Sequence, residues 1–282
     1  MSSRPTRRFG ASQCAVAALL TGWLLPGLAS ELVTLKTRPG VTVSVMVMVL
    51  EPSGPPKGVL IAYVGGEGTL GLTTVLGKAV IGNSSYEQGF LVRNRERWVA
   101  AGYALLLPDV PSDRKTLNYI YRLGEHQVDD ALPVVDLARQ RFGKAPWLLG
   151  TSASSMTVAN LASRPELQLG GIVLSASVTT MPPSYGAFRT HPEGTASARL
   201  QDVTVPALVL AHQDDACELS PPADSAKLVA RLTAAPRKTE RLFTGGTRPR
   251  SGPCLALSPH GFYGVEAEVE RAIIDFIDNT GS

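Results

Sequence analysis

The chain has 282 residues, of which 44% are hydrophobic and 6% are aromatic. This length and hydrophobic content allow a substantial core, and no internal repeat, long charge block or low-complexity linker divides the chain, so a single domain is expected. The formal net charge is only +3, and few aromatic side chains are available to stack on bases. Composition and charge therefore do not indicate a nucleic-acid partner.

The first 29 residues have the pattern of a secretory signal peptide. Three arginines within the first eight residues precede an apolar run over 15–25, and small residues suit cleavage after Ala29. Removing 1–29 takes away 3 of the 27 Lys and Arg residues and none of the 24 acidic residues, so 30–282 carries 24 of each. The apolar run is too short for an ordinary membrane span. The pattern predicts an exported protein, periplasmic or secreted, with no stable membrane anchor after cleavage.

Strands and helices are predicted to alternate after the leader. Two β-rich runs, 32–36 and 41–50, flank Arg38-Pro39-Gly40 and predict an antiparallel hairpin. Further strands are predicted at 59–64, 103–107, 146–149, 171–175, 206–211 and 241–243, and helices at 94–101, 121–141, 156–162 and 263–277. Pro133 either kinks the second of these helices or marks its first turn. This order predicts the α/β class, with a mostly parallel central sheet and helices on both faces.

A glycine-rich loop follows the first buried strand. Residues 66–71 match G-x-G-x-x-G, and Glu87 lies near the distance expected for an acid that binds the ribose of a dinucleotide. The next stretch, 72–83, contains Gly77 and Gly82 and makes a poor first helix for that fold. A dinucleotide site is therefore the weaker interpretation of this loop.

The most informative motif is Gly150-Thr151-Ser152-Ala153-Ser154, which lies between a buried strand and a helix-like run. A serine at such a turn, with small residues two positions before and after it, is typical of the nucleophile elbow of serine hydrolases. Ser154 stands where the usual motif, G-x-S-x-G, has its second glycine. The match is weaker because serine brings a Cβ into the crowded corner. A Gly/Ser-rich loop after a buried strand is the alternative interpretation of the pentapeptide.

An acid and a base follow Ser152 along the chain. The buried run 206–211 leads directly into His212-Gln213-Asp214-Asp215, where an orienting carboxylate would lie at the end of a strand. His260 lies in Ser258-Pro259-His260-Gly261-Phe262, just ahead of the last predicted helix. A histidine on this loop can reach over the edge of the sheet toward the serine.

The chain order Ser, Asp, His resembles that of the α/β-hydrolase superfamily, and the resemblance extends from Leu32 to the C-terminus. It implies an α/β-hydrolase domain over 30–282 with a small or absent lid. In that superfamily the acid follows its strand as h-G-x-x-D. Asp215 fits this spacing, with His212 in place of the glycine, and Asp214 is the alternative.

The resemblance assigns a role to each residue. Ser152 is the nucleophile, His260 accepts and returns its proton, and Asp215 orients the imidazole. Two backbone N–H groups should form the oxyanion hole. In the superfamily one of these N–H groups belongs to the residue after the nucleophile, here Ala153. The other belongs to the loop after the first central strand, and here either Gly66 or Glu67 would supply it.

The cysteines support export. Cys14 would leave with the leader, so Cys217 and Cys254 remain as one pair in an oxidising compartment. Cys217 is two residues after Asp215 and Cys254 is six before His260, so a disulfide would tie the acid loop to the histidine loop. The spacing of Asp-Ala-Cys and Ser-Pro-His-Gly-Phe is similar to that in exported bacterial α/β-hydrolases. Two free buried thiols are the alternative.

A stretch at 177–205 occupies the place where α/β-hydrolases insert a lid. Tyr185 and Phe188 within it either line an acyl or alcohol pocket or pack in a plain crossover. The other histidines are expected to be structural or exposed, because their spacing does not resemble a metal site: His126, His191 and His212.

These patterns predict a serine hydrolase that cleaves a carboxylic ester, or more broadly an acyl bond, of a small-molecule substrate through an acyl-enzyme. No cofactor or metal is expected. Two alternatives stay open: a peptidase or acyltransferase that uses the same triad, and a non-enzymatic exported binding protein of the same fold. The sequence indicates neither the substrate nor the oligomeric state.

Overall fold

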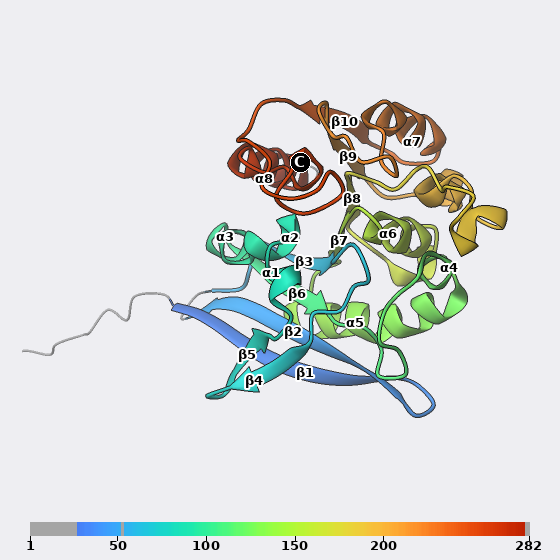
Figure 1. The fold of residues 1–282 in the computed structure, drawn as a ribbon. Coiled ribbons are helices and arrows are strands. Elements are labelled where there is room, and N and C mark those ends of the chain that lie inside the picture. The colour runs from blue at the N-terminus through green and yellow to red at the C-terminus, as the bar shows by residue number, and fades with distance from the viewer. Residues whose placement is uncertain (1–26, 52–53, 280–282) are drawn as a thin grey trace, which may run out of the picture.

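The computed structural model describes residues 27–51 and 54–279, and an eight-stranded sheet forms its centre (Figure 1). The strand order is β1-β2-β6-β3-β7-β8-β9-β10. The β1–β2 and β2–β6 pairs are antiparallel and the other neighbours are parallel. The strands are β1 Gly27–Arg38, β2 Val41–Glu51, β3 Gly58–Tyr63, β6 Tyr103–Pro108, β7 Trp147–Thr151, β8 Gly171–Ser175, β9 Ala207–His212 and β10 Lys238–Phe243. The predicted α/β sheet is confirmed.

The predicted N-terminal hairpin is also confirmed, and it is longer than expected. Residues 27–29 already belong to β1 and pair with residues 49–51 of β2. Cleavage after Ala29 would therefore remove the first three residues of this strand. The rest of the predicted leader lies outside the described residues. Within the part of the chain that the structure describes, no helix is long and apolar enough to cross a membrane.

Helices cover both faces of the sheet (Figure 1). One face packs against α5, α6 and α7, through side chains such as Val135, Leu161 and Leu228. The other packs against α2, α3 and α8, through side chains such as Trp98 and Ile273. The central strands are buried on both sides, so their sequences are continuous apolar runs rather than alternating ones. The helices are α1 Ser84–Glu87, α2 Phe90–Arg93, α3 Arg95–Ala100, α4 Tyr119–Arg122, α5 Glu125–Phe142, α6 Ser154–Ala162, α7 Ser225–Arg231 and α8 Glu266–Asp278.

The helix predicted at 121–141 is two helices. α4 ends at Arg122, with Leu123 as its C-cap, and Gly124 is the N-cap of α5, which begins at Glu125. Pro133 thus lies inside α5, and its interpretation as a first-turn residue is wrong. The helix tolerates the proline because residues on both sides of it, among them Ala131, Val134 and Val135, are buried in the core.

The glycine motif at 66–71 leads into a small hairpin, β4 Leu72–Val75 and β5 Lys78–Ile81, and does not open a helix. The carboxylate of Asp109 accepts hydrogen bonds from the N–H groups of Leu70 and Leu72, both at 2.8 Å, and so fixes the start of this hairpin. The helix N-terminus that holds a pyrophosphate in a dinucleotide site does not follow the motif. This context disfavours the dinucleotide interpretation.

The stretch at 177–205 contains three one-turn 3-10 helices, Gly186–Arg189, Gly194–Ser197 and Leu200–Asp202. Two of them contact α6 and α7. Tyr185 and Phe188 are both 38% exposed, and the Tyr185 ring lies 5.7 Å from that of Tyr119. Neither residue lines the cavity described below. The structure favours a packed crossover over a lid in this stretch.

Candidate active site

Ser152 lies at the turn between β7 and α6 and has a φ of +56°. This left-handed conformation is uncommon for a residue with a side chain and is the strained geometry of a nucleophile elbow. Gly150 allows the turn, because a Cβ at that position would lie 2.7 Å from the carbonyl oxygen of Ser154 and 2.8 Å from Cγ2 of Val158. The chain can therefore reverse direction only with glycine at 150.

Ser154, which replaces the second glycine of the motif, is fully buried. Its hydroxyl accepts a hydrogen bond from the N–H of Thr151 at 2.8 Å and lies 2.6 Å from the carbonyl oxygen of Tyr63. The serine thus ties the elbow to the end of β3. This explains how the departure from glycine is accommodated, since the added hydroxyl has two partners in the corner that it crowds.

The acid loop follows β9. Oδ2 of Asp215 lies 2.8 Å from Nδ1 of His260, and Oδ1 of Asp215 accepts the N–H of Cys217 at 2.9 Å. The Asp214 side chain is 69% exposed and lies 3.9 Å from Nδ1 of His212. Of the two candidate carboxylates, Asp215 is the one that meets His260.

His212 occupies the glycine position of the acid motif and is completely buried. Its Nδ1 accepts the N–H of Asp214 at 3.1 Å, and its Nε2 lies 3.1 Å from the carbonyl oxygen of Gly245. This pattern requires a neutral imidazole that donates from Nε2. His212 therefore links the acid loop to the segment after β10, in agreement with its predicted structural role.

His260 lies in a one-turn 3-10 helix, Pro259–Gly261. A Cβ on Gly261 would lie 2.0 Å from the carbonyl oxygen of Ala256, so only glycine fits beside the histidine. Arg93 of α2 donates to the carbonyl groups of Ala256 at 3.1 Å and Gly261 at 2.5 Å. Nε2 of His260 is buried and has no hydrogen-bond partner among the described residues.

Ser220 contacts both the acid and the histidine, and sequence reasoning did not find it. Its hydroxyl lies 3.2 Å from Oδ2 of Asp215 and 3.0 Å from Nδ1 of His260. Nothing in the sequence distinguishes it from other loop serines, because the contact depends on the path of the chain after Cys217.

The predicted disulfide is present. Cys217 and Cys254 are bonded, with their Cα atoms 4.6 Å apart. The bond joins the acid loop directly to the segment that leads to His260. Cys217 is buried, and Cys254 lies on the wall of the adjoining cavity.

Ser152 and His260 line one cavity of about 250 Å³. Its wall is largely apolar, and none of the described residues that line it is Asp, Glu, Lys or Arg. The volume is below the usual range of ligand pockets, roughly 300–1,000 Å³. The apolar side chains of the wall are Val64, Phe90, Leu91, Val92, Leu255 and Ala256.

The chain matches no model of a known protein family and no curated protein. Among solved structures it resembles an esterase of Pyrococcus furiosus, with 10% identity, a TM-score of 0.61 and coverage of 89% of this chain and 91% of the other. It also resembles Est1E from Butyrivibrio proteoclasticus, with 13% identity, a TM-score of 0.60 and coverage of 89% and 98%. A cold-adapted esterase from an Arctic intertidal metagenomic library shows 13% identity, a TM-score of 0.56 and coverage of 89% and 93%. The chain has the α/β-hydrolase fold.

In this α/β-hydrolase fold the glycine loop after β3, which begins at Gly65, packs closely against the turn that carries Ser152. A Cβ on Gly65 would lie 2.8 Å from the carbonyl oxygen of Thr151 and 3.1 Å from Cβ of Ser152. Gly66 lines the cavity and Glu67 does not. The N–H of Glu67, one of the two donors predicted for this loop, is already bonded to the hydroxyl of Tyr86 at 2.8 Å.

The remaining histidines lie away from the cavity. His126 is exposed beside Asp129, and His191 is paired with the hydroxyl of Thr190 at 2.8 Å. Burial lowers the pKa of His191. Within the described residues, no group of three His, Cys, Asp or Glu side chains could hold a metal ion.

Proposed function

We propose that the protein is a serine hydrolase that cleaves a small carboxylic ester through an acyl-enzyme, with Ser152 as nucleophile, His260 as base and Asp215 as the orienting acid. One observation carries the proposal. A serine in the strained elbow conformation shares a cavity with a histidine whose Nδ1 is bonded to a buried carboxylate and whose Nε2 has no partner among the described residues. This is the arrangement in which an imidazole can take a proton from a serine hydroxyl.

The reaction begins when Oγ of Ser152 attacks the carbonyl carbon of the ester and its proton moves to Nε2 of His260. The tetrahedral intermediate then loses the alcohol, whose oxygen receives that proton as the C–O bond breaks. A water molecule attacks the acyl-enzyme and gives one proton to His260. When the bond to Oγ breaks, His260 returns this proton to Ser152 and the carboxylic acid is released.

The first donor to the developing oxyanion is the N–H of Ala153. Ala153 directly precedes α6 and has no side-chain cap, and its N–H has no acceptor among the described residues. A donor next to the nucleophile lies on the side where the carbonyl oxygen becomes negative.

The cavity supports a small, uncharged ester as substrate. An apolar wall stabilises an apolar acyl or alcohol group, and a charged group would lose its hydration with no side chain of opposite charge to replace it. A panel of p-nitrophenyl esters with acyl chains of increasing length, tested beside peptide amides, checks this. We expect turnover of short acyl esters, and cleavage of amides with no cleavage of esters would support the peptidase alternative instead.

A fluorophosphonate probe tests the assignment of the nucleophile. Mass-spectrometric mapping should place the adduct on Ser152 and should find no adduct in Ser152→Ala. Ser177→Ala is a suitable control, because Ser177 is buried and its hydroxyl has no hydrogen-bond partner among the described residues. Absence of labelling together with absence of turnover would favour a non-enzymatic binding protein of this fold.

We also propose that the protein is exported and begins at Ser30 after cleavage. The leader-like sequence of 1–29 and the disulfide support this, since disulfides persist in oxidising compartments. Fractionation of a bacterial host that expresses the full chain, followed by N-terminal sequencing, tests it. Recovery of the uncleaved chain from the cytoplasm alone would contradict the proposal.

A further inference from the structure

The hydroxyl of Tyr86 lies beside Gly66 and Glu67, the two residues expected to supply the second oxyanion donor. Tyr86 lines the same cavity as Ser152, and a Cβ on Gly66 would lie 3.1 Å from the Tyr86 hydroxyl oxygen. A Cβ on the preceding residue, Gly65, would lie 3.1 Å from Cβ of Ser152. Two consecutive loop residues thus separate the nucleophile from the tyrosine hydroxyl.

Tyr86 can donate a hydrogen bond into the cavity. Its oxygen accepts the N–H of Glu67 at 2.8 Å, and its own proton has no acceptor among the described residues. Burial raises the pKa of the Tyr86 hydroxyl, so the group keeps its proton at neutral pH. An oxygen that already accepts one hydrogen bond becomes a stronger donor, because hydrogen bonds in a chain polarise one another.

Short-range contacts hold Tyr86 in this place. The tyrosine lies in α1, and the side chain of its N-cap, Asn83, accepts the N–H of Ser85 at 3.3 Å. Asn83 also donates from Nδ2 to the carbonyl oxygen of Thr69 at 3.1 Å. The helix that carries Tyr86 is therefore bonded to the glycine loop that carries Glu67.

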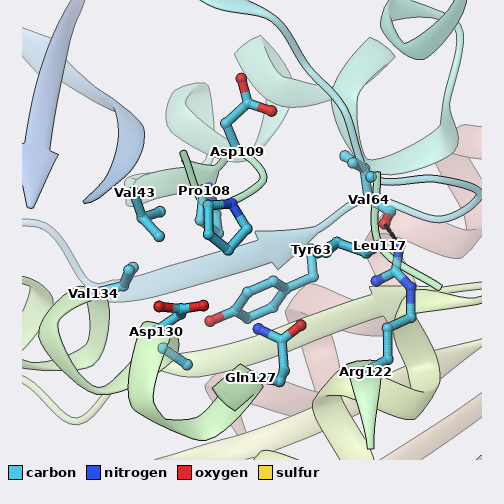
Figure 2. A pocket seen from close by; sticks show the side chains of 13 residues that line it. Val43, Tyr63, Val64, Pro108, Asp109, Leu117, Arg122, Gln127, Asp130 and Val134 are labelled. Atoms are coloured by element: carbon cyan, nitrogen blue, oxygen red, sulfur yellow. Dashed lines mark hydrogen bonds between the residues drawn. The ribbon is translucent and has the colours of Figure 1, made fainter. Parts of the chain in front are cut away.

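A buried cation, Arg122, lies at the carbonyl end of the Gly66–Glu67 peptide group, whose N–H binds Tyr86. Arg122 is 1% exposed, and the acceptors that its guanidinium binds among the described residues are uncharged oxygens. Its guanidinium donates to the carbonyl oxygens of Gly66 at 2.9 Å and Val64 at 3.2 Å, and to the hydroxyl of Thr157 at 3.1 Å. Figure 2 shows the guanidinium beside Val64. Burial lowers the pKa of Arg122 to about 10, so it stays charged at neutral pH.

The Gly66–Glu67 peptide group connects the cation to the tyrosine. In a trans peptide the C=O and N–H point in opposite directions. A cation that binds the Gly66 carbonyl therefore strengthens the Glu67 N–H as a donor to Tyr86. The chain of contacts runs from Arg122 through this peptide group to the Tyr86 hydroxyl, which borders the cavity.

We propose that the Tyr86 hydroxyl, and not the Glu67 N–H, is the second donor to the oxyanion, and that Arg122 polarises it through the Gly66–Glu67 peptide group. This inference rests on the proposed ester hydrolysis at Ser152. Tyr86 would touch the reacting oxygen and would be a catalytic residue, whereas Arg122 would be a positioning residue that acts through it. Such donors stabilise charge that develops only in the transition state, so they act on kcat more than on KM.

Tyr86→Phe tests the donor, because it removes only the hydroxyl. Loss of one oxyanion donor lowers kcat by about 10² to 10³, and we expect that loss with little change in KM on the best p-nitrophenyl ester. Affinity for an arylboronic acid, which forms a tetrahedral adduct on serine, should fall with kcat. Tyr119→Phe is the matched control, since Tyr119 is also half-buried but does not line the cavity. Unchanged kcat in Tyr86→Phe would overturn the proposal, and raised kcat would show that Tyr86 blocks the Glu67 N–H instead.

A double-mutant cycle tests the role of Arg122. Arg122→Lys keeps the charge but loses the planar guanidinium, whose Nη2 binds the two carbonyls while its Nη1 binds Thr157. If Arg122 acts through Tyr86, the loss of kcat in Arg122→Lys disappears when Tyr86 is already phenylalanine. If Arg122→Lys lowered kcat equally with Tyr86 and with phenylalanine at position 86, Arg122 would not act through Tyr86. Tyr86→Phe decides the donor role even if Arg122→Lys does not fold.

The Ser152→Ala variant separates this inference from the proposed function. If Ser152→Ala is inactive while Tyr86→Phe is fully active, only the role of Tyr86 is wrong. If Ser152→Ala keeps the turnover of the wild type, the proposed serine mechanism itself is wrong.

Discussion

Nδ1 of His260 lies 2.8 Å from Oδ2 of Asp215, although 45 residues separate them in the sequence. The histidine side chain is 5% exposed and the aspartate side chain 1%. A carboxylate in this place holds the proton on Nδ1 and leaves Nε2 free to accept one. Nε2 of His260 accordingly has no hydrogen-bond partner among the described residues.

Single substitution of the nucleophile or the base should remove nearly all ester turnover. We expect Ser152→Ala and His260→Ala each to lower kcat by about 10⁴ or more, and the double variant to lose little further, because the two groups act as one unit. Steady-state kinetics on the best ester of the panel measures this. If Ser152→Ala retained more than about a tenth of the wild-type kcat, the nucleophile assignment would be refuted.

The two neighbouring aspartates should differ sharply in effect. Asp215→Asn should lower kcat by roughly 10³ to 10⁴ with little loss of folding, because the amide cannot hold the imidazole in the required tautomer. Asp214→Asn should change kcat only slightly, since the Asp214 side chain is largely exposed and does not contact His260. Kinetics and thermal denaturation of both variants test this, and the opposite ranking would transfer the role to Asp214.

Ser220 should support the pair formed by Asp215 and His260. Ser220→Ala removes a donor to the carboxylate, and a hydrogen bond to a charged group contributes about 1.5 kcal/mol or more, which corresponds to about tenfold in kcat. The loss should appear in kcat with little change in KM, because the Ser220 hydroxyl contacts Asp215 and His260 and does not line the cavity. Ser220→Thr should restore kcat. A fall in melting temperature with no change in kcat would show a structural role only.

Removal of the disulfide should affect the site before it affects the sheet. The bond closes a loop with a sequence separation of 37 residues, for which the chain-entropy model gives roughly 3 to 4 kcal/mol. We expect Cys217→Ser with Cys254→Ser to lower kcat while far-UV circular dichroism still reports the fold. The loss should be partial, because Arg93 also holds the histidine loop through Ala256 and Gly261.

Peptide mapping under non-reducing conditions checks the bond itself. Protein purified from the periplasm should yield the peptides of Cys217 and Cys254 joined. Recovery of both as free, alkylatable thiols would contradict the disulfide and would weaken the proposal of export.

The sequence by itself predicted the alternation of strands and helices along the chain, the α/β class, the elbow at Ser152 and the candidate partners at Asp215 and His260. These features are local: an apolar run bounded by turn residues, a serine between small residues, and a polar residue at the end of a buried strand. The cysteine pair was also visible, because one pair remains once the leader is set aside.

Only the tertiary structure decided which neighbours complete the site. It separates Asp215 from Asp214, brings Ser220 to His260, and places Tyr86 on the Glu67 N–H with Arg122 behind it. These contacts join segments 19 to 56 residues apart, and no local pattern encodes them. Their geometry follows from how α1, α4 and the loops after β3 and β9 pack at one edge of the sheet. A side chain that finds its partner through that packing has the same local sequence as one that faces water.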